Sequence, residues 1–536
     1  MSTYMSIEMS TFVSRQMSIP ESPNRARICP KSPRLPALMS TFMSKLMSTT
    51  IAHVGGGGLW LVRAARRMNS RQRITKSTCV DWVCADPVTW DSDHRLDIRL
   101  PHSYSKATLR KADQGTMIRL GVIGYGGRAQ GVLGLIGQLS AGTEVVAITD
   151  VRNEEIKQEM ALRQAQDAQG VGAQGDQALR QAQPLRQAQG AQGVAFYTDP
   201  DEMLDKEQLD GVLIGTRCSL HTKMAIKVLQ RNLPLYLEKP VATNMQDLLA
   251  LRAAARASSS EVVVSFPLRV TPLVQLAKQI INSGQIGTVE HVQAWNNVNY
   301  GWCYYQGWYR DENETQGLFL QKATHDFDYI NHLLGIKPCW VCAIKSKQIY
   351  KGDHPAGLRC DDCDEQDSCL ESPFHAYYTK QEAPRVQPSG LLCGFAVDTG
   401  NEDSGSALIQ YETGMHACYS QNFFARKTAG KRGASLFGYK GTIEFDWYTD
   451  ELKVHMHHTP RTETHKMQTS GASHGGGDTV LADNFVRVIR GECKSVAPLD
   501  AGLLSVLMCL AAKKSAETRT FQEIRFPEMD AESSSA

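Results

Sequence analysis

From Met117 onward, short apolar runs alternate with segments whose apolar residues recur at helical spacing. The runs predict strands at 118–123, 143–149, 194–198, 211–215, 233–238 and 261–266. The segments between them predict helices at about 127–139, 152–165, 200–205, 220–231 and 243–257. Regular alternation of strands and helices is typical of a parallel, doubly wound sheet. Ligands of such sheets bind in the crevice at the carboxyl ends of the strands.

Beyond Pro272 the pattern changes. A helix at 273–283 leads into longer strands in which apolar and polar residues alternate, at 288–297, 406–411, 416–421, 441–447 and 452–457. This alternation is typical of an antiparallel sheet with one covered face. We therefore predict an α/β fold in which a doubly wound parallel sheet is followed by a second domain. The other face of the second sheet could meet a symmetry mate, so we expect a homo-oligomer, a dimer or a tetramer.

The turn after the first predicted strand reads Gly124-Tyr125-Gly126-Gly127-Arg128-Ala129. Gly124 permits a tight turn, Gly126 lets the backbone approach a pyrophosphate, and Ala129 lets the following helix pack closely on the strand. The phosphates would lie on free N–H groups at the helix N-terminus. Because this turn opens a strand–helix–strand unit, we expect a dinucleotide cofactor.

An acidic residue, Asp150, ends the second strand, 21 residues after the turn. Its carboxylate would accept hydrogen bonds from a ribose diol and repel a 2′-phosphate, which favours NAD. Arg152 could pair with such a phosphate, so NADP stays possible.

Other polar groups at strand ends are Thr216, His221 and Glu238-Lys239-Pro240. The proline ends the strand ladder and helps to fix Lys239 at the mouth of the crevice. A lysine there can hydrogen-bond a substrate hydroxyl and, if burial lowers its pKa, help to move a proton. An ordinary solvated lysine is the alternative.

Four further polar residues, Gln321, Lys322, His325 and Asp328, lie in a segment that we predict to be helical. Their spacing places Gln321, Lys322 and His325 on one helix face, and Asp328 joins them less closely. Hydride loss from a secondary alcohol needs a group that takes the hydroxyl proton, and an imidazole suits that task. His325 is therefore a candidate acid/base.

These motifs, with Gly284-Gln-Ile-Gly-Thr and His325-Asp-Phe-Asp328, resemble the glucose–fructose oxidoreductase and inositol dehydrogenase family (Gfo/Idh/MocA) from about Met117 to Pro527. The resemblance implies an N-terminal Rossmann domain, a C-terminal α/β domain on an open, mainly antiparallel sheet, an NAD(P) cofactor and sugar-like or cyclitol substrates. It also implies Lys239 and His325 as the catalytic residues. Cofactor contacts are expected from Gly124, Tyr125, Gly126, Gly127, Arg128, Ala129, Asp150, Thr216, His221 and Glu238, and substrate contacts from Arg269, Gln321, Lys322 and Asp328.

Gln321 departs from the family pattern, because many members carry an aspartate four residues before the histidine. Lys322 matches a sub-group with a lysine three residues before it. A glutamine can orient a hydroxyl but cannot tune an imidazole as a carboxylate would. The leading hypothesis is an NAD(P)-dependent oxidoreductase that acts on a CH–OH group of a polyhydroxylated substrate. A redox-assisted glycosidase that uses NAD and a non-catalytic NAD-binding protein are the alternatives.

A polar loop at 354–369 holds Cys360, Cys363 and Cys369, with His354 six residues before the first of them. Thiols at this spacing suit tetrahedral zinc, and His354 could complete a set of three cysteines and one histidine. The surrounding acids raise thiol pKa values, which disfavours a redox-reactive role. Free thiols and a disulfide are the alternatives to a structural metal.

Composition narrows the function classes further. The chain has 536 residues, and 58 Lys and Arg nearly balance 56 Asp and Glu, so no nucleic-acid partner is expected. The sequence contains no run of 18 apolar residues, so no membrane span is expected. Fourteen cysteines in a long nucleotide-binding chain favour reduced thiols and a cytoplasmic location. An aromatic stretch from Trp295 to Tyr309 could hold a sugar ring or pack in an interface.

Two segments differ from the rest. Residues 1–116 are of low complexity, with serine after all seven methionines of the first fifty residues. We interpret them as a disordered or mis-assigned extension, with a transit peptide as the alternative. The segment 161–193 repeats Leu-Arg-Gln-Ala-Gln three times and is interpreted as a tolerated insertion. The expected domains are a Rossmann domain at 117–240, a substrate-binding and oligomerisation domain at 241–527, and a tail at 528–536.

Overall fold

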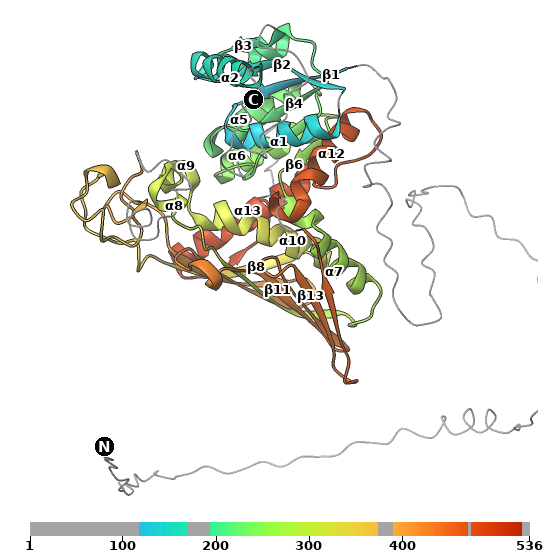
Figure 1. Ribbon diagram of the computed structural model, residues 1–536. Coiled ribbons are helices and arrows are strands. Elements are labelled where there is room, and N and C mark those ends of the chain that lie inside the picture. Colours follow the sequence, from blue (N-terminus) through green and yellow to red (C-terminus); the bar gives the residue numbers. More distant parts are fainter. Residues whose placement is uncertain (1–116, 141, 169–192, 374–389, 470–472, 528–536) are drawn as a thin grey trace, which may run out of the picture. The chain divides into compact units, whose positions relative to one another are not determined.

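The computed structural model describes residues 117–527, apart from 141, 169–192, 374–389 and 470–472. The predicted N-terminal extension, most of the predicted insertion and the tail lie outside the described residues. Within the described chain, one sheet of six strands and one of nine organise the protein (Figure 1).

The six-stranded sheet is parallel, in the order β3-β2-β1-β4-β5-β6. Its strands are β1 (Ile118–Ile123), β2 (Thr143–Thr149), β3 (Ala195–Tyr197), β4 (Gly211–Ile214), β5 (Leu235–Leu237) and β6 (Val262–Val264). Central strand β1 is buried at nearly every position, as expected of a parallel strand covered on both faces. The strand order reverses between β1 and β4, which opens a crevice at the carboxyl ends. The predicted doubly wound parallel sheet is confirmed.

The helices of this half begin close to the predicted positions. They are α1 (Gly127–Leu139), α2 (Asn153–Ala168), α4 (Pro200–Lys206), α5 (His221–Gln230) and α6 (Met245–Arg256). Asp199 caps helix α4, because its side chain accepts a hydrogen bond from the Asp201 N–H. Asn244 caps helix α6 in the same way and accepts from the Asp247 N–H. These side-chain caps satisfy N–H groups of the first turns and so fix where the helices start.

The second sheet has the order β14-β13-β12-β11-β7-β10-β9-β8-β15. Its strands are β7 (Val289–Asn297), β8 (Pro338–Ser346), β9 (Ser404–Tyr411), β10 (His416–Asn422), β11 (Lys431–Gly438), β12 (Gly441–Asp446), β13 (Glu451–Met456), β14 (Thr462–Lys466) and β15 (Gln522–Glu523). All neighbours are antiparallel except β7 and β10, which run parallel. The expectation of a mainly antiparallel sheet is confirmed.

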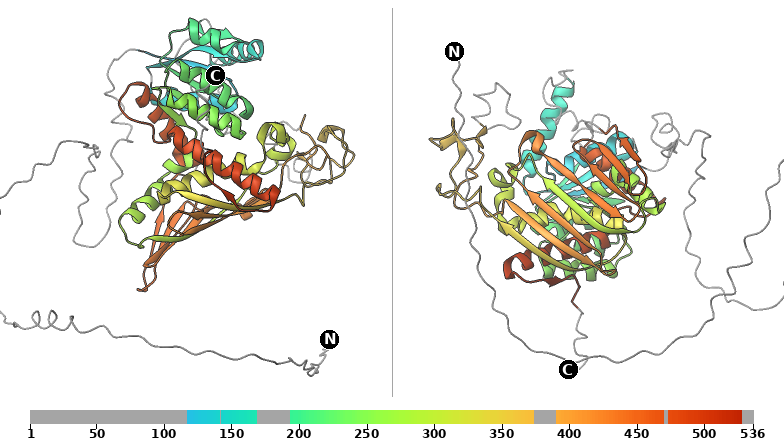
Figure 2. Two further views of the ribbon diagram at one scale, coloured as in Figure 1. Left: turned by 180° about the vertical axis from the view of Figure 1, so that it is seen from behind. Right: turned by 90° about the horizontal axis from the view of Figure 1, so that it is seen from below.

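One face of this sheet is covered by helices α7 (Pro272–Asn282), α10 (Thr324–Leu334) and α13 (Leu499–Thr518) (Figure 1). The other face, seen from below in the right panel of Figure 2, carries no helix of the described chain. Strand β9 shows the contrast between the faces, because Ile409 is buried whereas its neighbour Leu408 is 49% exposed.

The C-terminal segment returns to the first sheet and joins the two halves. Helix α12 (Gly477–Ile489) packs against α1. Strand β6 pairs with β5, and the Val264 N–H donates to the Ala497 carbonyl at 2.8 Å. The Rossmann sheet therefore extends past the boundary predicted at residue 240 and ends at Val264.

Two local expectations were wrong. The predicted helical segment that holds Gln321 and His325 is not one α-helix, because Phe319–Ala323 is a π-helical turn that precedes α10. Strands β11 and β14 were not predicted. In β11 nearly every position is buried, and in β14 none is, so neither strand shows an alternation of apolar and polar residues.

Candidate active site

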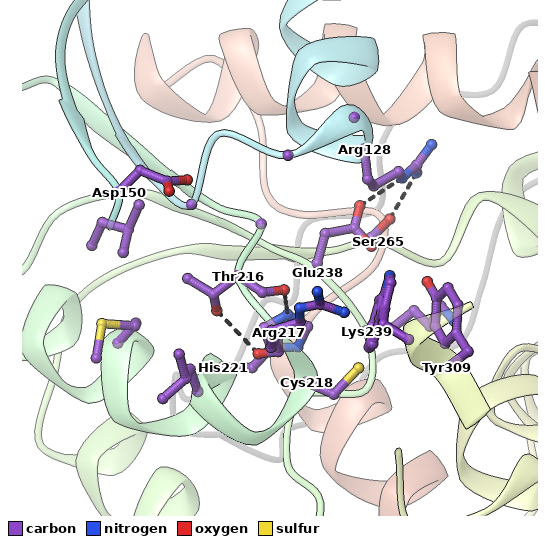
Figure 3. A pocket seen from close by; sticks show the side chains of 18 of the residues that line it. Arg128, Asp150, Thr216, Arg217, Cys218, His221, Glu238, Lys239, Ser265 and Tyr309 are labelled. Atoms are coloured by element: carbon purple, nitrogen blue, oxygen red, sulfur yellow. Dashed lines mark hydrogen bonds and ion pairs between the residues drawn. The ribbon is translucent and has the colours of Figure 1, made fainter. Parts of the chain in front are cut away.

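A cavity of about 750 Å³ lies at the carboxyl ends of the parallel strands (Figure 3). The first domain lines it with the glycine turn, Asp150, Thr216, His221, Glu238 and Lys239, among others. The second domain contributes Lys322 and His325, together with aromatic residues that precede them in the chain. The structure thus brings the predicted cofactor turn and the two predicted catalytic residues to one pocket.

The glycine turn fits the close approach of a pyrophosphate. Gly124 has a φ of +84°, and a Cβ there would lie 2.7 Å from the Thr216 backbone nitrogen. Gly127 would meet nothing within 4 Å, and a Cβ on Gly126 would meet only a carbonyl oxygen at 3.8 Å, so the turn leaves open space. No side chain caps the first turn of α1. Its N–H groups and the space beside them suit phosphate oxygens.

Helix α1 lies close to strand β4 because of two small residues. A Cβ added to Gly215 would approach the Ala129 Cβ to 2.9 Å, so this contact allows nothing larger. Ala129 is fully buried, in agreement with its predicted packing role, and it does not line the pocket. The contact fixes the start of α1 against the end of β4.

The carboxylate of Asp150 is held in place by two backbone donors at the end of β2. The Tyr125 N–H donates to Oδ2 and the Arg152 N–H to Oδ1, both at 2.9 Å. The Arg152 guanidinium Nε lies 3.4 Å from the same carboxylate. A carboxylate oriented in this way can accept hydrogen bonds from ribose hydroxyls.

Arg128 takes part in a network between the domains. Its guanidinium contacts Glu238 at 2.7 Å and Asp478 at 2.6 Å, and it donates to the Ser265 hydroxyl at 2.9 Å. His474 lies 2.7 Å from the Asp478 carboxylate. Arg128 and Glu238 line the pocket, as predicted, but in this structure they pair with each other and fix α1 to α12.

His221 is a buried residue that connects two pocket loops. Its Nδ1 lies 2.8 Å from the Pro240 carbonyl. Its Nε2 lies 3.1 Å from the Thr216 carbonyl (Figure 3). Burial lowers the pKa of His221. Both ring nitrogens therefore contact backbone, and the residue holds the Thr216 and Pro240 loops in register at the cavity wall.

Lys239 projects from the end of β5 into the cavity. Its Nζ donates to the Gln321 carbonyl at 2.9 Å. Burial lowers the pKa of Lys239 to about 8, with a further contribution from the charge of Lys322. A lysine with this pKa has a substantial neutral fraction near physiological pH and can accept a proton.

The π-helical turn separates Gln321 and Lys322. The Gln321 side chain is fully buried away from the pocket, where its amide donates to the Thr315 carbonyl at 3.2 Å. Lys322 instead lines the pocket and donates to the Tyr300 hydroxyl at 2.5 Å. Burial lowers the pKa of Lys322 to about 7. Gln321 therefore contributes its backbone carbonyl to the site, through Lys239.

His325 stands in the first turn of α10 and is 5% exposed. Its ring packs edge-on against Phe266, with centroids 5.9 Å apart, and lies 6.2 Å from the His474 ring. Its Nδ1 is buried without a hydrogen-bond partner among the described residues. Burial and the charge of Lys239 hold the pKa of His325 well below its ordinary value, so the ring is neutral at physiological pH.

Several pocket residues were not assigned to the site from the sequence. They are Tyr300, Tyr304, Trp308, Tyr309, Arg217, Cys218, Ser265 and His474. The four aromatic residues belong to the stretch for which sugar contact was one of two interpretations. His474 follows a glycine- and serine-rich segment and gave no signal of its own. The Arg217 guanidinium lies 3.9 Å from the centre of the Trp308 ring.

Two predicted substrate residues, Arg269 and Asp328, contact each other instead of the cavity. The Arg269 guanidinium donates to both Asp328 oxygens, at 2.6 and 2.9 Å, and neither residue lines the pocket. Burial raises the pKa of Asp328 to about 6 in spite of the opposing charge of Arg269. In this structure the pair fixes the turn before α7 to helix α10.

Replacing Arg269 by methionine is expected to lower the free energy of unfolding by about 3–5 kcal/mol, because it leaves a buried carboxylate unpaired. Loss of the guanidinium raises the pKa of Asp328 further, so the folded variant keeps a proton that the unfolded chain releases. Its stability therefore falls as pH rises, and the deficit is larger near about pH 8 than near about pH 5. Urea unfolding measures both effects. Arg487→Met, at an exposed ion pair, is the control, and equal losses in the two variants would contradict this account.

The cysteine loop forms a separate feature. Cys360, Cys363 and Cys369 line a small cavity of their own, and His354 does not line it. Burial and the neighbouring thiols raise the pKa of Cys360 to about 12, which makes it an unreactive thiol.

A dinucleotide-type glycine turn, a Rossmann sheet and a second α/β domain that completes the pocket define a two-domain NAD-binding oxidoreductase. Two family profiles match the chain: "Oxidoreductase family, NAD-binding Rossmann fold" at residues 118–266 and "Oxidoreductase family, C-terminal alpha/beta domain" at 278–524. The chain therefore belongs to the Gfo/Idh/MocA oxidoreductase family, as its motifs had indicated.

Individual relatives agree with this assignment. The oxidoreductase YteT of Bacillus subtilis is 26% identical over 317 residues, which span 53% of this chain and 74% of that protein. The scyllo-inositol 2-dehydrogenase (NAD(+)) of the same organism is 28% identical over 145 residues, 26% of this chain and 39% of its own length. A levoglucosan dehydrogenase solved with NADH and levoglucosan shares the fold, with a TM-score of 0.56 and 17% identity over 76% of this chain and 99% of its own.

No helix within the described part of the chain combines the length and the apolar character that a membrane crossing needs.

Proposed function

We propose that this protein oxidises a secondary alcohol of a sugar, a cyclitol or a related polyhydroxylated compound and uses NAD as the hydride acceptor. The observation that carries the proposal is the pocket, where Lys239, Lys322 and His325 face the glycine turn. Burial lowers the pKa of all three residues. Amines with a substantial neutral fraction near physiological pH, and a neutral imidazole, are suited to take a hydroxyl proton.

The glycine turn and Asp150 are the residues that would hold the cofactor. The open space at Gly126 and Gly127 accommodates phosphate groups, and the oriented Asp150 carboxylate accepts ribose hydroxyls. Bound NAD would supply the hydride acceptor, nicotinamide C4. Gly124 keeps the turn tight, since its φ of +84° excludes larger residues.

Between the two candidate proton acceptors, Lys239 is the better base. Its pKa of about 8 is near the operating pH, whereas an imidazolium at His325 is strongly disfavoured by burial and by Lys239 itself. We therefore assign proton acceptance to the Lys239 Nζ. His325 lines the same pocket, and its neutral imidazole would orient the reacting hydroxyl. The Gln321 carbonyl holds Lys239 in position for this step.

The substrate class follows from the wall opposite the turn. Tyr300, Tyr304, Trp308 and Tyr309 offer aromatic faces to the apolar side of a sugar ring. The Lys322 amine, which reaches the Tyr300 hydroxyl, provides a donor for ring hydroxyls. Direct substrate contact by Arg269, Gln321 and Asp328 stays a prediction that no observation supports, because these side chains are turned away from the pocket.

The test is formation of NADH by the full-length protein across a panel of sugars, cyclitols and anhydrosugars. Net NADH with at least one compound supports a dehydrogenase. Release of an aglycone from a glycoside without net NADH would indicate the redox-assisted glycosidase instead. Thermal stabilisation by NAD, with no turnover of any compound, would indicate a non-catalytic NAD-binding protein.

Replacing Asp150 by alanine is expected to weaken NAD binding by about 10–100-fold, which corresponds to loss of hydrogen bonds to a charged acceptor. NADP binding should change less, because repulsion of its 2′-phosphate is removed at the same time. The preference for NAD over NADP should therefore shrink. Calorimetric titration with NAD and with NADP measures this preference. Asp210→Ala is the control, because Asp210 lies at the amino ends of the parallel strands, where it accepts from the Arg119 N–H. An unchanged ratio would refute the role of Asp150.

We also propose that the protein is cytoplasmic and that the open face of the nine-stranded sheet associates with a second copy. The open face carries exposed apolar side chains, among them Trp340, Ile344 and Leu408. Such side chains are suited to a subunit interface. A dimer or a tetramer would appear in sedimentation at micromolar concentration.

A further inference from the structure

A fourth cysteine joins the three of the predicted metal loop. Cys360, Cys363, Cys369 and Cys393 all line the same small cavity in the long connection between β8 and β9. Cys360 and Cys393 are each 6% exposed, and the other two are half-buried. All four are free thiols in this structure. His354, which the sequence suggested as the fourth ligand, is not part of this cavity wall.

Backbone pairing brings Cys393 to the loop. Arg359 and Leu392 form an antiparallel bridge, the Cys360 N–H donates to the Leu391 carbonyl at 2.8 Å, and the Cys393 N–H donates to the Leu358 carbonyl at 2.7 Å. In this register Cys360 and Cys393 are diagonal neighbours on one face of the bridge. Cys363 follows on the same short turn, because its N–H donates to the Cys360 carbonyl at 3.4 Å.

N–H donors are aimed at three of the sulfurs. The Gln306 amide donates to the Cys360 Sγ at 3.9 Å and is itself anchored by the Glu371 carbonyl. Backbone N–H groups of Glu371 and Ser372 face the Cys369 sulfur, and that of Phe395 faces the Cys393 sulfur. Donors around a sulfur offset part of the cost of burying a metal-bound thiolate.

We propose that Cys360, Cys363, Cys369 and Cys393 bind one structural zinc ion. Four thiolates with N–H donors around them and no open coordination position are typical of structural zinc sites. Each thiol that binds the ion releases its proton. Six acidic residues between positions 361 and 371 add a negative potential that favours a cation.

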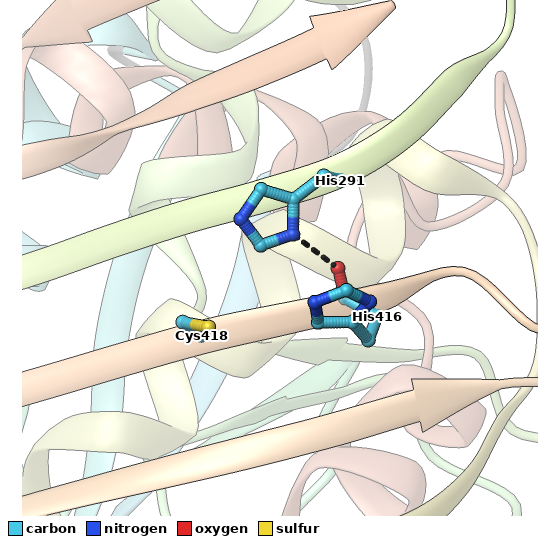
Figure 4. A group of neighbouring side chains, drawn as sticks. All are labelled: His291, His416 and Cys418. Carbon is cyan, nitrogen blue, oxygen red and sulfur yellow. Dashed lines mark hydrogen bonds between the residues drawn. The ribbon is translucent and has the colours of Figure 1, made fainter.

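Another group of metal-ligating side chains lies on the open face of the nine-stranded sheet. His291, His416 and Cys418 form the group whose ligand atoms lie within 4.8 Å of one another in the described chain (Figure 4). Both ring nitrogens of His291 already have partners, the His416 carbonyl at 3.2 Å and the Gln293 amide at 3.3 Å. The four cysteine sulfurs approach one another less closely, so zinc must draw them together by rotation of their side chains. The four-thiol set nevertheless offers complete coordination, which the trio of His291, His416 and Cys418 does not.

The proposed zinc site would support the aromatic wall of the pocket. The Leu392 N–H donates to the carbonyl of Gln306, which ends the short helix α8 (Cys303–Gln306). Further along the same connection, the Asn401 amide donates to the carbonyls of Tyr304 and Tyr309 at 3.0 and 2.7 Å. The loop thus buttresses Tyr304 and Tyr309, which line the cavity, and Tyr350 and Phe395 are its residues in the small apolar cluster beside them. A metal cross-link would add to the stability that this small cluster provides.

Elemental analysis of the full-length protein, purified without chelator, tests the proposal independently of any catalytic activity. We expect about one zinc ion per chain. Replacement by cobalt(II) should give thiolate-to-metal charge-transfer bands and the visible bands of tetrahedral cobalt. Both signals should be lost in Cys363→Ser and in Cys393→Ser and retained in Cys339→Ser, a half-buried cysteine of β8.

Three outcomes would overturn the proposal. The first is folded protein that takes up neither zinc nor cobalt when these ions are added. The second is a disulfide between any two of the four cysteines, found by mass spectrometry of an unreduced digest. The third is metal that survives in Cys393→Ser but is lost in His416→Ala, which would place the ion on the open sheet face. The cobalt spectrum of the unaltered protein decides the matter even if a serine variant fails to fold.

Discussion

Turnover of the alcohol substrate is expected to fall by about 10²–10⁴-fold when Lys239 is replaced by methionine, the range for loss of a positioned proton acceptor. Methionine keeps the length and the apolar stem of the side chain but cannot take a proton. In the unaltered protein the rate of oxidation should rise with pH through about 8, where Lys239 loses its charge, and then level off. This rise should be absent from the variant.

Steady-state kinetics over a pH series, with NAD affinity measured separately by calorimetry, separates chemistry from binding. NAD affinity should stay within a few-fold, because the glycine turn and Asp150 are untouched. Lys453→Met, at an exposed lysine of β13, is the matched control. Undiminished turnover in Lys239→Met would show that Lys239 is not the proton acceptor.

Replacing His325 by phenylalanine is expected to reduce turnover by about 10–100-fold, which corresponds to the loss of one hydrogen bond to a charging hydroxyl. The effect is smaller than that of Lys239 because the imidazole orients the substrate and the lysine takes the proton. The phenylalanine ring can keep the edge-on packing against Phe266. The rise of the rate with pH through about 8 should therefore persist in this variant.

The pH profile distinguishes the two roles in the same assay. If the rise disappears in His325→Phe and persists in Lys239→Met, the assignments of the two residues are reversed. His332→Phe is a control on the same helix, at a residue that does not line the pocket. It should leave the pH profile unchanged.

The Rossmann half could be predicted from the sequence because its determinants are local. Each parallel strand is an apolar run that is followed by a glycine or a polar residue, and helix starts carry capping side chains such as Asp199 and Asn244. The glycine turn is equally local. Its geometry requires a positive φ at Gly124 and a small residue at position 129, and both requirements are visible in six consecutive residues. The placement of Lys239 followed from the strand that ends before it.

The second half was less predictable because its site depends on contacts between distant segments. The π-helical turn at Phe319–Ala323 rotates Gln321 away from Lys322, which α-helical spacing could not indicate. Arg269 and Asp328 are 59 residues apart in the chain. The sequence does not show that they form an ion pair, so each was interpreted as a substrate ligand. Glu314 shows the same effect, since its carboxylate accepts from the Ser219 N–H, 95 residues earlier in the chain.

His474 and Cys393 reach their sites through long connections. His474 enters the pocket beside His325 only because α12 returns to the first domain, and Cys393 meets Cys360 only through the bridge at Arg359 and Leu392. No spacing along the chain encodes either contact. The glutamine at position 321, which departs from the family pattern, supports Lys239 through its backbone carbonyl. Any residue at this position would offer the same carbonyl.

The proposed function rests on transfer of a hydride from a substrate carbon to NAD in this pocket. A substrate found in the panel, carrying deuterium on the reacting carbon, can be mixed with full-length protein and NAD, and the nicotinamide can then be analysed by mass spectrometry. We expect deuterium in the reduced nicotinamide and a slower turnover than with unlabelled substrate, whether NADH is released or stays bound. Conversion of the substrate with no deuterium in the nicotinamide would exclude hydride transfer to NAD.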